Sequence, residues 1–265
     1  MTPMSRSAIL LTLVAVAGAA SAQNYQAWDG IYAGVNAGSA SNTTCNSWTP
    51  TGATIDPAIA TALYDQTCAG GGKLVAGVQI GDNFQHKRFV WGIGADLDIW
   101  NSKTSNASLT YTGAAPPAGS YASSGKLSPS DFVIIGPRIG YAGDQWMPYL
   151  RVGGVITSGS HDSTLSFTPT GAAKPTVSFG GGNNYSSSGW AAGGGAEIGL
   201  HGAWSISAEY LHVDLGKGST TAATCSGTAA ACAGFSGIAF DSMHSSFIAN
   251  IVRISINYWF GYWGS

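Results

Sequence analysis

Seven charged side chains could act together, because all of them fall on one face of alternating stretches that are otherwise apolar or glycine-rich. They are Asp96, Asp98, Arg138, Arg151, Glu197, Glu209 and Arg253. Carboxylates and guanidinium groups enclosed in a narrow space either pair with one another or line a constriction that admits small ions. The chemistry available to this set is therefore ion pairing or ion passage.

Three ion pairs are expected within the set, because an unpaired charge is costly in a narrow interior. The order and depth of the stretches that carry these residues predict the pairs Glu209–Arg253, Glu197–Arg151 and Asp96–Arg138. Seven glycines share the charged face, and they either leave room for a pore or only ease the curvature of a sheet. They are Gly34, Gly77, Gly81, Gly92, Gly94, Gly193 and Gly195.

The five histidines do not form a recognisable catalytic or metal-binding arrangement. His212 and His244 have many serines near them, but no G-x-S-x-G or other nucleophile motif occurs. His86 and His201 fall in short polar connections, where solvation is the simplest role, and a lone His161 or His244 rarely ligates haem or a metal. We therefore predict no enzyme activity, no metal site and no cofactor.

The elements that must position the charges are β-strands, and the last one, Phe247–Phe260, shows the pattern. From Val252 onward, apolar and polar residues alternate strictly, with Arg253 on the polar face. The stretch exceeds the 9–11 residues or so that a tilted strand needs to cross a membrane. A lone strand cannot do so, because each unpaired backbone group in lipid costs several kcal/mol, so the last strand is expected to pair with the first.

Seven further stretches alternate in the same way, and the connections between them alternate in length. The predicted strands are 31–41, 73–84, 89–100, 130–141, 147–158, 187–200, 203–214 and 247–260. The long connections are 42–72, 101–126, 159–186 and 215–246, and the short ones are 85–88, 142–146 and 201–202. This alternation predicts an all-β fold: an eight-stranded antiparallel up-and-down transmembrane β-barrel of the outer membrane, with four long outer loops and three short periplasmic turns.

Aromatic residues support the same topology, because nine of them fall at the expected periplasmic strand ends, as an interfacial girdle should. They are Phe84, Phe89, Trp91, Tyr141, Trp146, Tyr149, Trp204, Tyr258 and Phe260. The lipid-facing side of the strands is expected to carry no charge. Pro137 lies inside a predicted strand and predicts a local bulge there, because proline removes a ladder hydrogen bond.

The first 22 residues have the features of a cleaved signal peptide. Arg6 is followed by an apolar core at 8–20, and Ala20-Ser21-Ala22 fits the cleavage pattern. A membrane anchor is disfavoured because the apolar run is short. We therefore predict a signal peptide at 1–22 and a barrel domain at 23–265.

The composition agrees with a barrel in a membrane. Only 9 % of residues are charged, whereas a soluble domain has about 25 %. With 11 basic and 13 acidic residues, the chain shows no basic surface for nucleic acid.

Four cysteines in an exported chain predict disulfide bonds. Cys45 and Cys68 belong to one long connection, and Cys225 and Cys232 to another. Pairing within each connection and pairing between them both remain open, because the first and last connections become neighbours when the sheet closes.

The chain resembles the small outer-membrane surface-antigen family, which is related to the opacity proteins and to the OmpA membrane domain. The resemblance lies in W-D-G-I-Y-A-G-V-N-A-G (28–38), G-V-Q-I-G-D-N-F (77–84), F-V-W-G-I-G-A-D-L-D (89–98), I-I-G-P-R-I-G-Y-A (134–142), P-Y-L-R-V-G-G (148–154), G-W-A-A-G-G-G-A-E (189–197), W-S-I-S-A-E-Y-L-H-V-D-L-G (204–216) and V-R-I-S-I-N-Y-W-F (252–260). It implies an outer-membrane porin-type or surface-antigen barrel of a Gram-negative cell. Barrels of this family usually end at the terminal aromatic, whereas residues 261–265 follow Phe260 here.

These observations predict a monomeric surface protein with a structural role and at most narrow, low-conductance permeation. A general diffusion porin is the alternative, and a receptor or adhesin that acts through its outer loops is a further one. The expected partners are outer-membrane lipid and lipopolysaccharide, together with the barrel-assembly machinery, which would read Tyr258 and Phe260.

Overall fold

The structure, a computed structural model, describes residues 28–51, 67–100, 105–113, 119–169, 177–220, 224–226 and 239–260. They form ten strands: β1 (Gly30–Thr51), β2 (Thr67–His86), β3 (Phe89–Trp100), β4 (Ser105–Gly113), β5 (Gly119–Tyr141), β6 (Trp146–Pro169), β7 (Val177–Gly199), β8 (Trp204–Thr220), β9 (Thr224–Ser226) and β10 (Ala239–Trp259). No helix in the described part of the chain is long and apolar enough to span a membrane. The predicted signal peptide lies outside the described residues.

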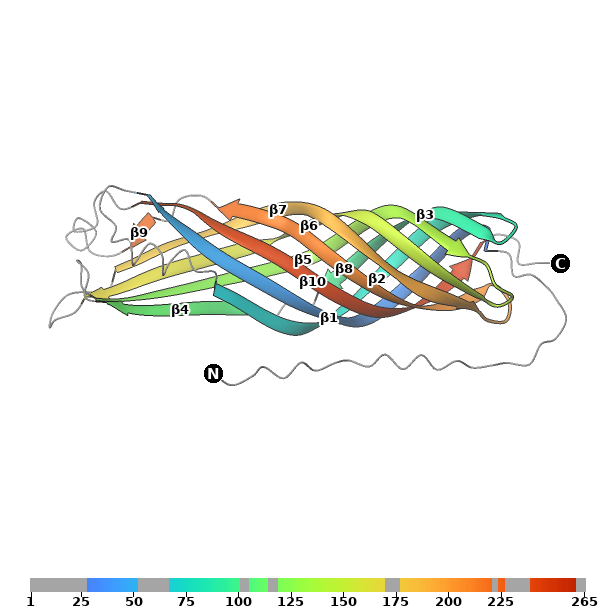
Figure 1. Cartoon of the computed structure of the whole chain (residues 1–265), viewed down its shortest axis with the longest axis horizontal. Coiled ribbons are helices and arrows are strands. Elements are labelled where there is room, and N and C mark those ends of the chain that lie inside the picture. Colours follow the sequence, from blue (N-terminus) through green and yellow to red (C-terminus); the bar gives the residue numbers. More distant parts are fainter. Residues whose placement is uncertain are drawn as a thin grey trace.

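Eight of these strands close into an antiparallel barrel, as predicted (Figure 1). Neighbours pair in the order β1, β2, β3, β5, β6, β7, β8 and β10, and β10 returns to β1 as the expected partner of the first strand. β4 pairs with β5, and β9 pairs with β7, so both lie beside the ring rather than in it. Short turns connect β2 to β3, β5 to β6 and β7 to β8 at one end of the barrel, here called the turn end.

The backbone register gives the tilt of the strands. Followed once around the ring from Trp146, the paired residues return to β6 at Ile156, a stagger of ten residues from 146 to 156. Eight strands with this stagger tilt by about 40° from the barrel axis, and their interior is just wide enough for side chains to fill.

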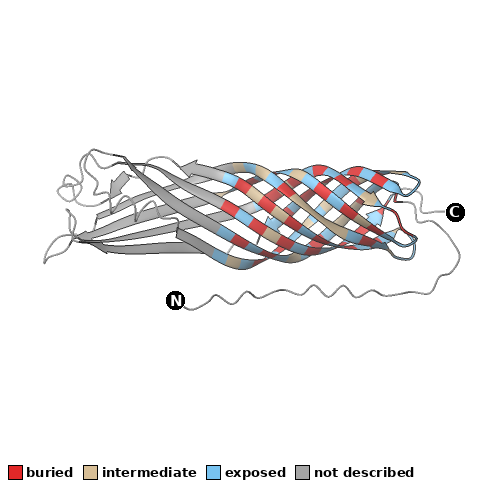
Figure 2. Ribbon diagram, in the orientation of Figure 1, coloured by how far each residue is buried: buried red, intermediate tan, exposed pale blue. Residues whose placement is uncertain are grey.

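Side chains alternate between the inside and the outside of the barrel, which Figure 2 shows as alternating buried and exposed bands along each strand. On β10, Val252 and Ile254 are 50 % and 56 % exposed, whereas Arg253 and Ser255 are 1 % and 2 % exposed. The predicted faces of the strands are thus the observed ones.

The aromatic girdle at the turn end is present, with one correction. Eight of the nine predicted aromatics are exposed there, and pairs such as Phe84–Trp91 and Trp204–Tyr258 pack with ring centroids 4.7 and 5.1 Å apart. Tyr149 is instead inside and 6 % exposed. It lies two residues from Arg151 on β6 and therefore shares its inward face.

The prediction of an uncharged lipid face is wrong at the edges of the outer surface. Asp82, Asp131 and Asp214 have the outward parity of their strands, next to Ile80, Val133 and Tyr210. Asp82 lies near the turn end and the other two near the opposite end. A carboxylate close to an interface costs less than one at mid-depth, because it can reach water.

Two other expectations about the strands are also wrong. The strands run well beyond the predicted limits, β1 to Thr51 and β6 to Pro169, and β4 lies in the segment predicted as a long loop. No register shift occurs at Pro137, which pairs with Ile93. The irregularity between β5 and β6 lies instead at Pro129/Asp131.

Candidate functional site in the barrel interior

The interior carries the seven predicted charges in one layer. Every one of them is buried, with exposed fractions between 0 and 8 %. β3 supplies Asp96 and Asp98, β5 Arg138, β6 Arg151, β7 Glu197, β8 Glu209 and β10 Arg253. Because each side chain has the inward parity of its strand, the ring closure directs them all to the same axis.

Arg253 is the centre of this layer, because it contacts three carboxylates from two sides of the lumen. Its Nη2 lies 2.6 Å from Glu209 Oε1 and 2.8 Å from Asp96 Oδ1, and its Nη1 lies 2.8 Å from Asp98 Oδ2. Glu209 is on the neighbouring strand, whereas the two aspartates reach across from β3. The pairing of Glu209 with Arg253 agrees with the sequence prediction.

The other two predicted pairs are wrong. Arg151 binds Asp96 at 2.5 Å and approaches Glu209 at 3.6 Å, rather than pairing with Glu197. Arg138 binds Glu197 at 3.0 Å, rather than Asp96.

The physical reason is the position of the two arginines. Arg138 and Arg151 are directly opposite each other on β5 and β6. Like charges that face each other repel, so the two guanidinium groups turn to different carboxylates.

An aromatic layer closes the lumen on the turn side of the charges. The Arg138 guanidinium lies 4.6 Å from the ring centroid of Tyr32, 5.0 Å from that of Tyr149 and 6.0 Å from that of Trp259. Cations are attracted to aromatic faces at such distances. The rings belong to a buried cluster of Trp28, Tyr32, Val90, Ala142, Met147, Tyr149 and Trp259.

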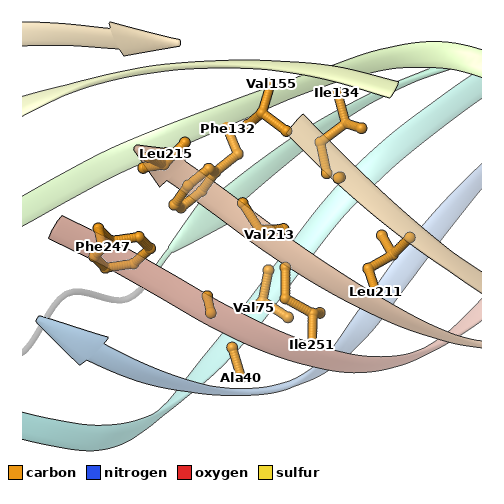
Figure 3. Packing of buried hydrophobic residues seen from close by; sticks show 12 residues of the cluster. Ala40, Val75, Phe132, Ile134, Val155, Leu211, Val213, Leu215, Phe247 and Ile251 are labelled. Carbon is orange, nitrogen blue, oxygen red and sulfur yellow. The ribbon is translucent and has the colours of Figure 1, made fainter. Parts of the chain in front are cut away.

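An apolar layer fills the lumen on the other side of the charges. Twelve inward residues form it, none more than 3 % exposed: Ala40, Val75, Phe132, Ile134, Val155, Ala191, Leu211, Val213, Leu215, Phe247, Ala249 and Ile251. Figure 3 shows their side chains pointing toward one another from different strands, and the rings of Phe132 and Phe247 are 6.1 Å apart. Sequence reasoning missed this layer, although its members share the inward parity of the charged residues.

The inward glycines do not leave an open channel. A Cβ at Gly34 would collide with Asn257 Oδ1, and one at Gly77 would collide with Asp98 Oδ1. At Gly81 the same atom would collide with the Tyr32 ring. Each of these glycines thus lies against an inward side chain of another strand, so the room for a pore, one of the two interpretations left open by the sequence, is occupied.

Neutral polar residues complete the charged layer, and they too were missed in the sequence. Glu197 Oε1 accepts hydrogen bonds from Ser205 Oγ at 2.5 Å and Asn257 Nδ2 at 2.9 Å, and Asn83 Oδ1 accepts from Arg138 Nε at 3.0 Å. Gln79 Nε2 donates to Asn257 Oδ1 at 2.6 Å. The alternation of inward and outward positions along each strand was the sequence signal that could have identified them. Such bonds satisfy the remaining lone pairs of buried carboxylates.

The remaining candidate residues lie elsewhere. Cys45 and Cys68 are directly opposite each other in the β1–β2 register, and Cys225 is opposite Phe179. Cys232 and the side chains of the other three cysteines lie outside the described residues. Among the described side chains, no three His, Cys, Asp or Glu residues come together as a metal site would require.

The fold, with an apolar outer face and an interior filled by aromatic, charged and apolar layers, defines a transmembrane-type, eight-stranded β-barrel. Residues 9–232 match the family of the outer membrane protein beta-barrel domain, and the chain belongs to that family. The predicted resemblance and the predicted location in the outer membrane are thereby confirmed.

Named relatives agree with this assignment, and two solved structures show a weak likeness to the chain. The chain is 29 % identical over 192 residues to the 31 kDa outer-membrane immunogenic protein of Brucella melitensis, with 72 % of each chain covered, and the Brucella suis protein gives the same values. The outer membrane protein OprG from Pseudomonas aeruginosa is 12 % identical, with 87 % of this chain and 96 % of that chain covered and a TM-score of 0.41. The outer membrane protease OmpT from Escherichia coli is 9 % identical, with 90 % and 99 % covered and a TM-score of 0.42. Likenesses this weak add nothing to the fold described above.

Proposed function

We propose that this protein is a structural surface barrel of the outer membrane whose membrane-spanning section is closed to all but rare, small ion currents. The observation that carries the proposal is the stacking of aromatic, charged and apolar layers along the lumen. The layers lie in series, so a solute that passes one still meets the next.

The charged layer alone is a strong barrier. A passing cation would have to draw Asp96, Asp98 or Glu209 away from Arg253, which is 1 % exposed. Breaking a buried ion pair by removing one partner costs about 3–5 kcal/mol. The apolar layer adds a dehydration cost, since apolar constrictions exclude water and ions. Either layer would obstruct the free passage of solutes that a general diffusion porin requires.

A second candidate, recognition at the cell surface, is favoured by the length of the strands. β5, β6 and β7 have 23, 24 and 23 residues, whereas crossing a bilayer takes about 9–11. Because long connections of such barrels face outward, the excess length would raise the outer loops above the membrane. Loops on a rigid support commonly carry recognition.

Ion conductance of the refolded protein in a planar bilayer tests the closed barrel, with heat-modifiable gel mobility to verify folding. We expect the native protein, Arg253→Ala alone and Phe132→Ala/Phe247→Ala to be nearly silent. Arg253→Ala/Phe132→Ala/Phe247→Ala should show more frequent small steps than any of these, because two of the three serial barriers are weakened and only the aromatic layer is left intact. Ile254→Ala, a lipid-facing change on β10, is the matched control. Large, frequent steps from the native protein that change in Glu209→Gln would overturn the proposal and establish a porin.

Surface recognition has its own test. Cells that display the native protein are compared with cells in which residues 52–66 are replaced by a short Gly-Ser linker, and adhesion to epithelial monolayers is counted. Equal adhesion at equal surface levels of folded protein would argue against a role for this loop.

A further inference from the structure

A cluster of polar and aromatic side chains lies on the outer, lipid-facing surface of β7, β8 and β10. Trp190, Tyr210, His212, Asp214 and Asn250, here called the outer-interface cluster, all have the outward parity of their strands. Trp190 and Tyr210 are 50 % and 48 % exposed. None of these side chains takes part in the interior layers, so the proposed function does not account for them.

The register places the cluster at the edge of the apolar band. His212 is eight residues from Trp204 of the aromatic girdle (204 to 212), and Asn250 is eight from Tyr258 (258 to 250). At about 3.3 Å per residue and a tilt of about 40°, both lie roughly 20 Å from the girdle. The apolar band of such barrels is about 25 Å tall, so these two residues lie just inside its outer edge, and Asp214, ten residues from Trp204, lies at the edge, beside the headgroups of the outer leaflet.

β2 and β3, on the far side of the ring from β8, carry large apolar side chains slightly further from the girdle. Leu74 and Ile99 lie ten residues from the girdle aromatics Phe84 and Phe89 and are 69 % and 62 % exposed. Asp131, the register partner of Ile99 on β5, adds a single outward carboxylate there. The cluster is therefore distinguished by two exposed aromatic rings next to hydrogen-bonding groups, and not by polarity alone.

Hydrogen bonds hold the cluster in one arrangement. Asn250 Oδ1 lies 2.7 Å from the Tyr210 hydroxyl, which donates to it, and 2.9 Å from His212 Nδ1. An amide oxygen has two lone pairs, so it accepts from both when His212 carries its proton on Nδ1. Asn250 Nδ2 and His212 Nε2 are then left to face a ligand. The Trp190 ring lies 5.5 Å from the His212 ring, and Asp214 Oδ1 accepts from Gly216 N at 2.7 Å.

We infer that the outer-interface cluster binds the sugar headgroup of an outer-leaflet glycolipid such as lipopolysaccharide. The exposed rings of Trp190 and Tyr210 provide flat apolar faces for a sugar ring, while their polar edges suit an interface. Asn250 Nδ2 donates to hydroxyl or amide oxygens, and Asp214 Oδ2 accepts from hydroxyl groups. With an aspartate and no Lys or Arg among its five members, the cluster suits sugar hydroxyls better than phosphate.

The binding test uses the full chain in detergent and native mass spectrometry. The probes are rough lipopolysaccharide, the same glycolipid after dephosphorylation, and phosphatidylglycerol. We expect the two glycolipids to bind with similar affinity and phosphatidylglycerol at least tenfold more weakly. Asn250→Ala, which removes polar contacts, and Trp190→Ala, which removes an apolar ring face, should each weaken glycolipid binding by about tenfold. Ile99→Ala, at similar height on the other side, should bind like the native protein.

Three results would overturn the inference. Unchanged affinity in both cluster variants would show that glycolipid binds elsewhere. A tenfold loss on dephosphorylation would show that phosphate is recognised instead of sugar. A protein dimer that dissociates in Asn250→Ala would make this face a contact between two copies of the chain. Heat-modifiable mobility of each variant excludes misfolding as the cause.

Discussion

Arg253 on β10 is directly opposite Glu209 on β8 in the sheet register, and its Nε donates a 2.9 Å hydrogen bond to Glu209 Oε1. The two residues are thus held together both by neighbouring strands and by charge. Arg253 alone also reaches across the lumen to Asp96 and Asp98. Removal of the two side chains would have unequal effects. Without the Glu209 carboxylate, Arg253 loses one of its three partners, whereas without the Arg253 guanidinium, three carboxylates each lose a cation.

This inequality predicts different costs for the two truncations. Arg253→Ala should lower the free energy of unfolding by about 3–5 kcal/mol, because it leaves buried carboxylates without their shared cation. Glu209→Ala should cost about 1–3 kcal/mol, since Arg253 keeps two partners. Urea unfolding in detergent micelles measures both, with the exposed turn residue Asp144→Ala as control. Equal costs for the two changes would contradict the central position of Arg253.

Replacement of glycine by alanine is expected to be costly at Gly38 and nearly neutral at Gly154. A Cβ at Gly38 would collide with the Val252 carbonyl oxygen and meet Arg253 Cα and Cβ at 2.6 and 2.8 Å, whereas one at the lipid-facing Gly154 meets nothing within 4 Å. Gly38→Ala should therefore lower the free energy of unfolding by about 1–3 kcal/mol through overpacking. Gly154→Ala should change it by less than about 1 kcal/mol. A stable Gly38→Ala barrel would mean that β1 and β10 lie further apart at Gly38 than the structure shows.

A glycine substitution in the turn between β2 and β3 is expected to stabilise the protein. Lys87 has a φ of 55°, in the left-handed region that glycine adopts without strain. Lys87→Gly should raise the free energy of unfolding by about 1 kcal/mol, because relief of strain outweighs the added freedom of the unfolded chain. Arg88→Gly, at a neighbour without positive φ, should lower it. Urea unfolding in detergent micelles measures both changes, and a loss of stability in Lys87→Gly would contradict the turn geometry.

Backbone register favours one disulfide pairing among those left open by the sequence. Cys45 and Cys68 are Cα partners on adjacent strands, so a bond between them needs no long-range rearrangement. We predict this bond, which closes a ring of 24 residues and should stabilise the barrel by about 3 kcal/mol. Peptide mapping without reductant identifies the linked residues. A peptide that joins Cys45 to Cys225 or Cys232 would rule the pairing out.

Phe260, at the end of the last strand, is expected to matter for assembly of the barrel in the membrane. Phe260 is 65 % exposed at the turn end, and Phe84, 47 % exposed, is a comparable girdle residue away from the chain end. If the assembly machinery reads the terminal aromatics, Phe260→Ala should reduce the heat-modifiable fraction in membranes severalfold, and Phe84→Ala should not. Equal reductions would indicate a general girdle effect and no recognition of Phe260.

The sequence by itself determined which face of each strand points into the lumen and how the strands connect, although Tyr149 was wrongly expected on the outside. Strict alternation around Arg253 requires one face in lipid and one in the lumen, because a β-strand has a period of two. Alternating connection lengths required an even number of strands with all short turns at one end. Both are local properties, so they can be read without knowing which strands meet.

Only the tertiary structure decided which inward groups contact one another. Arg138 and Arg151 turn to Glu197 and Asp96 because the register places the two arginines opposite each other and their long side chains cross the lumen. The glycines lie beside large side chains of other strands, as at Gly81 and Tyr32, which converts the apparent space of a pore into a packed core. Such contacts depend on the stagger and closure of the whole ring, and no single stretch of sequence contains that information.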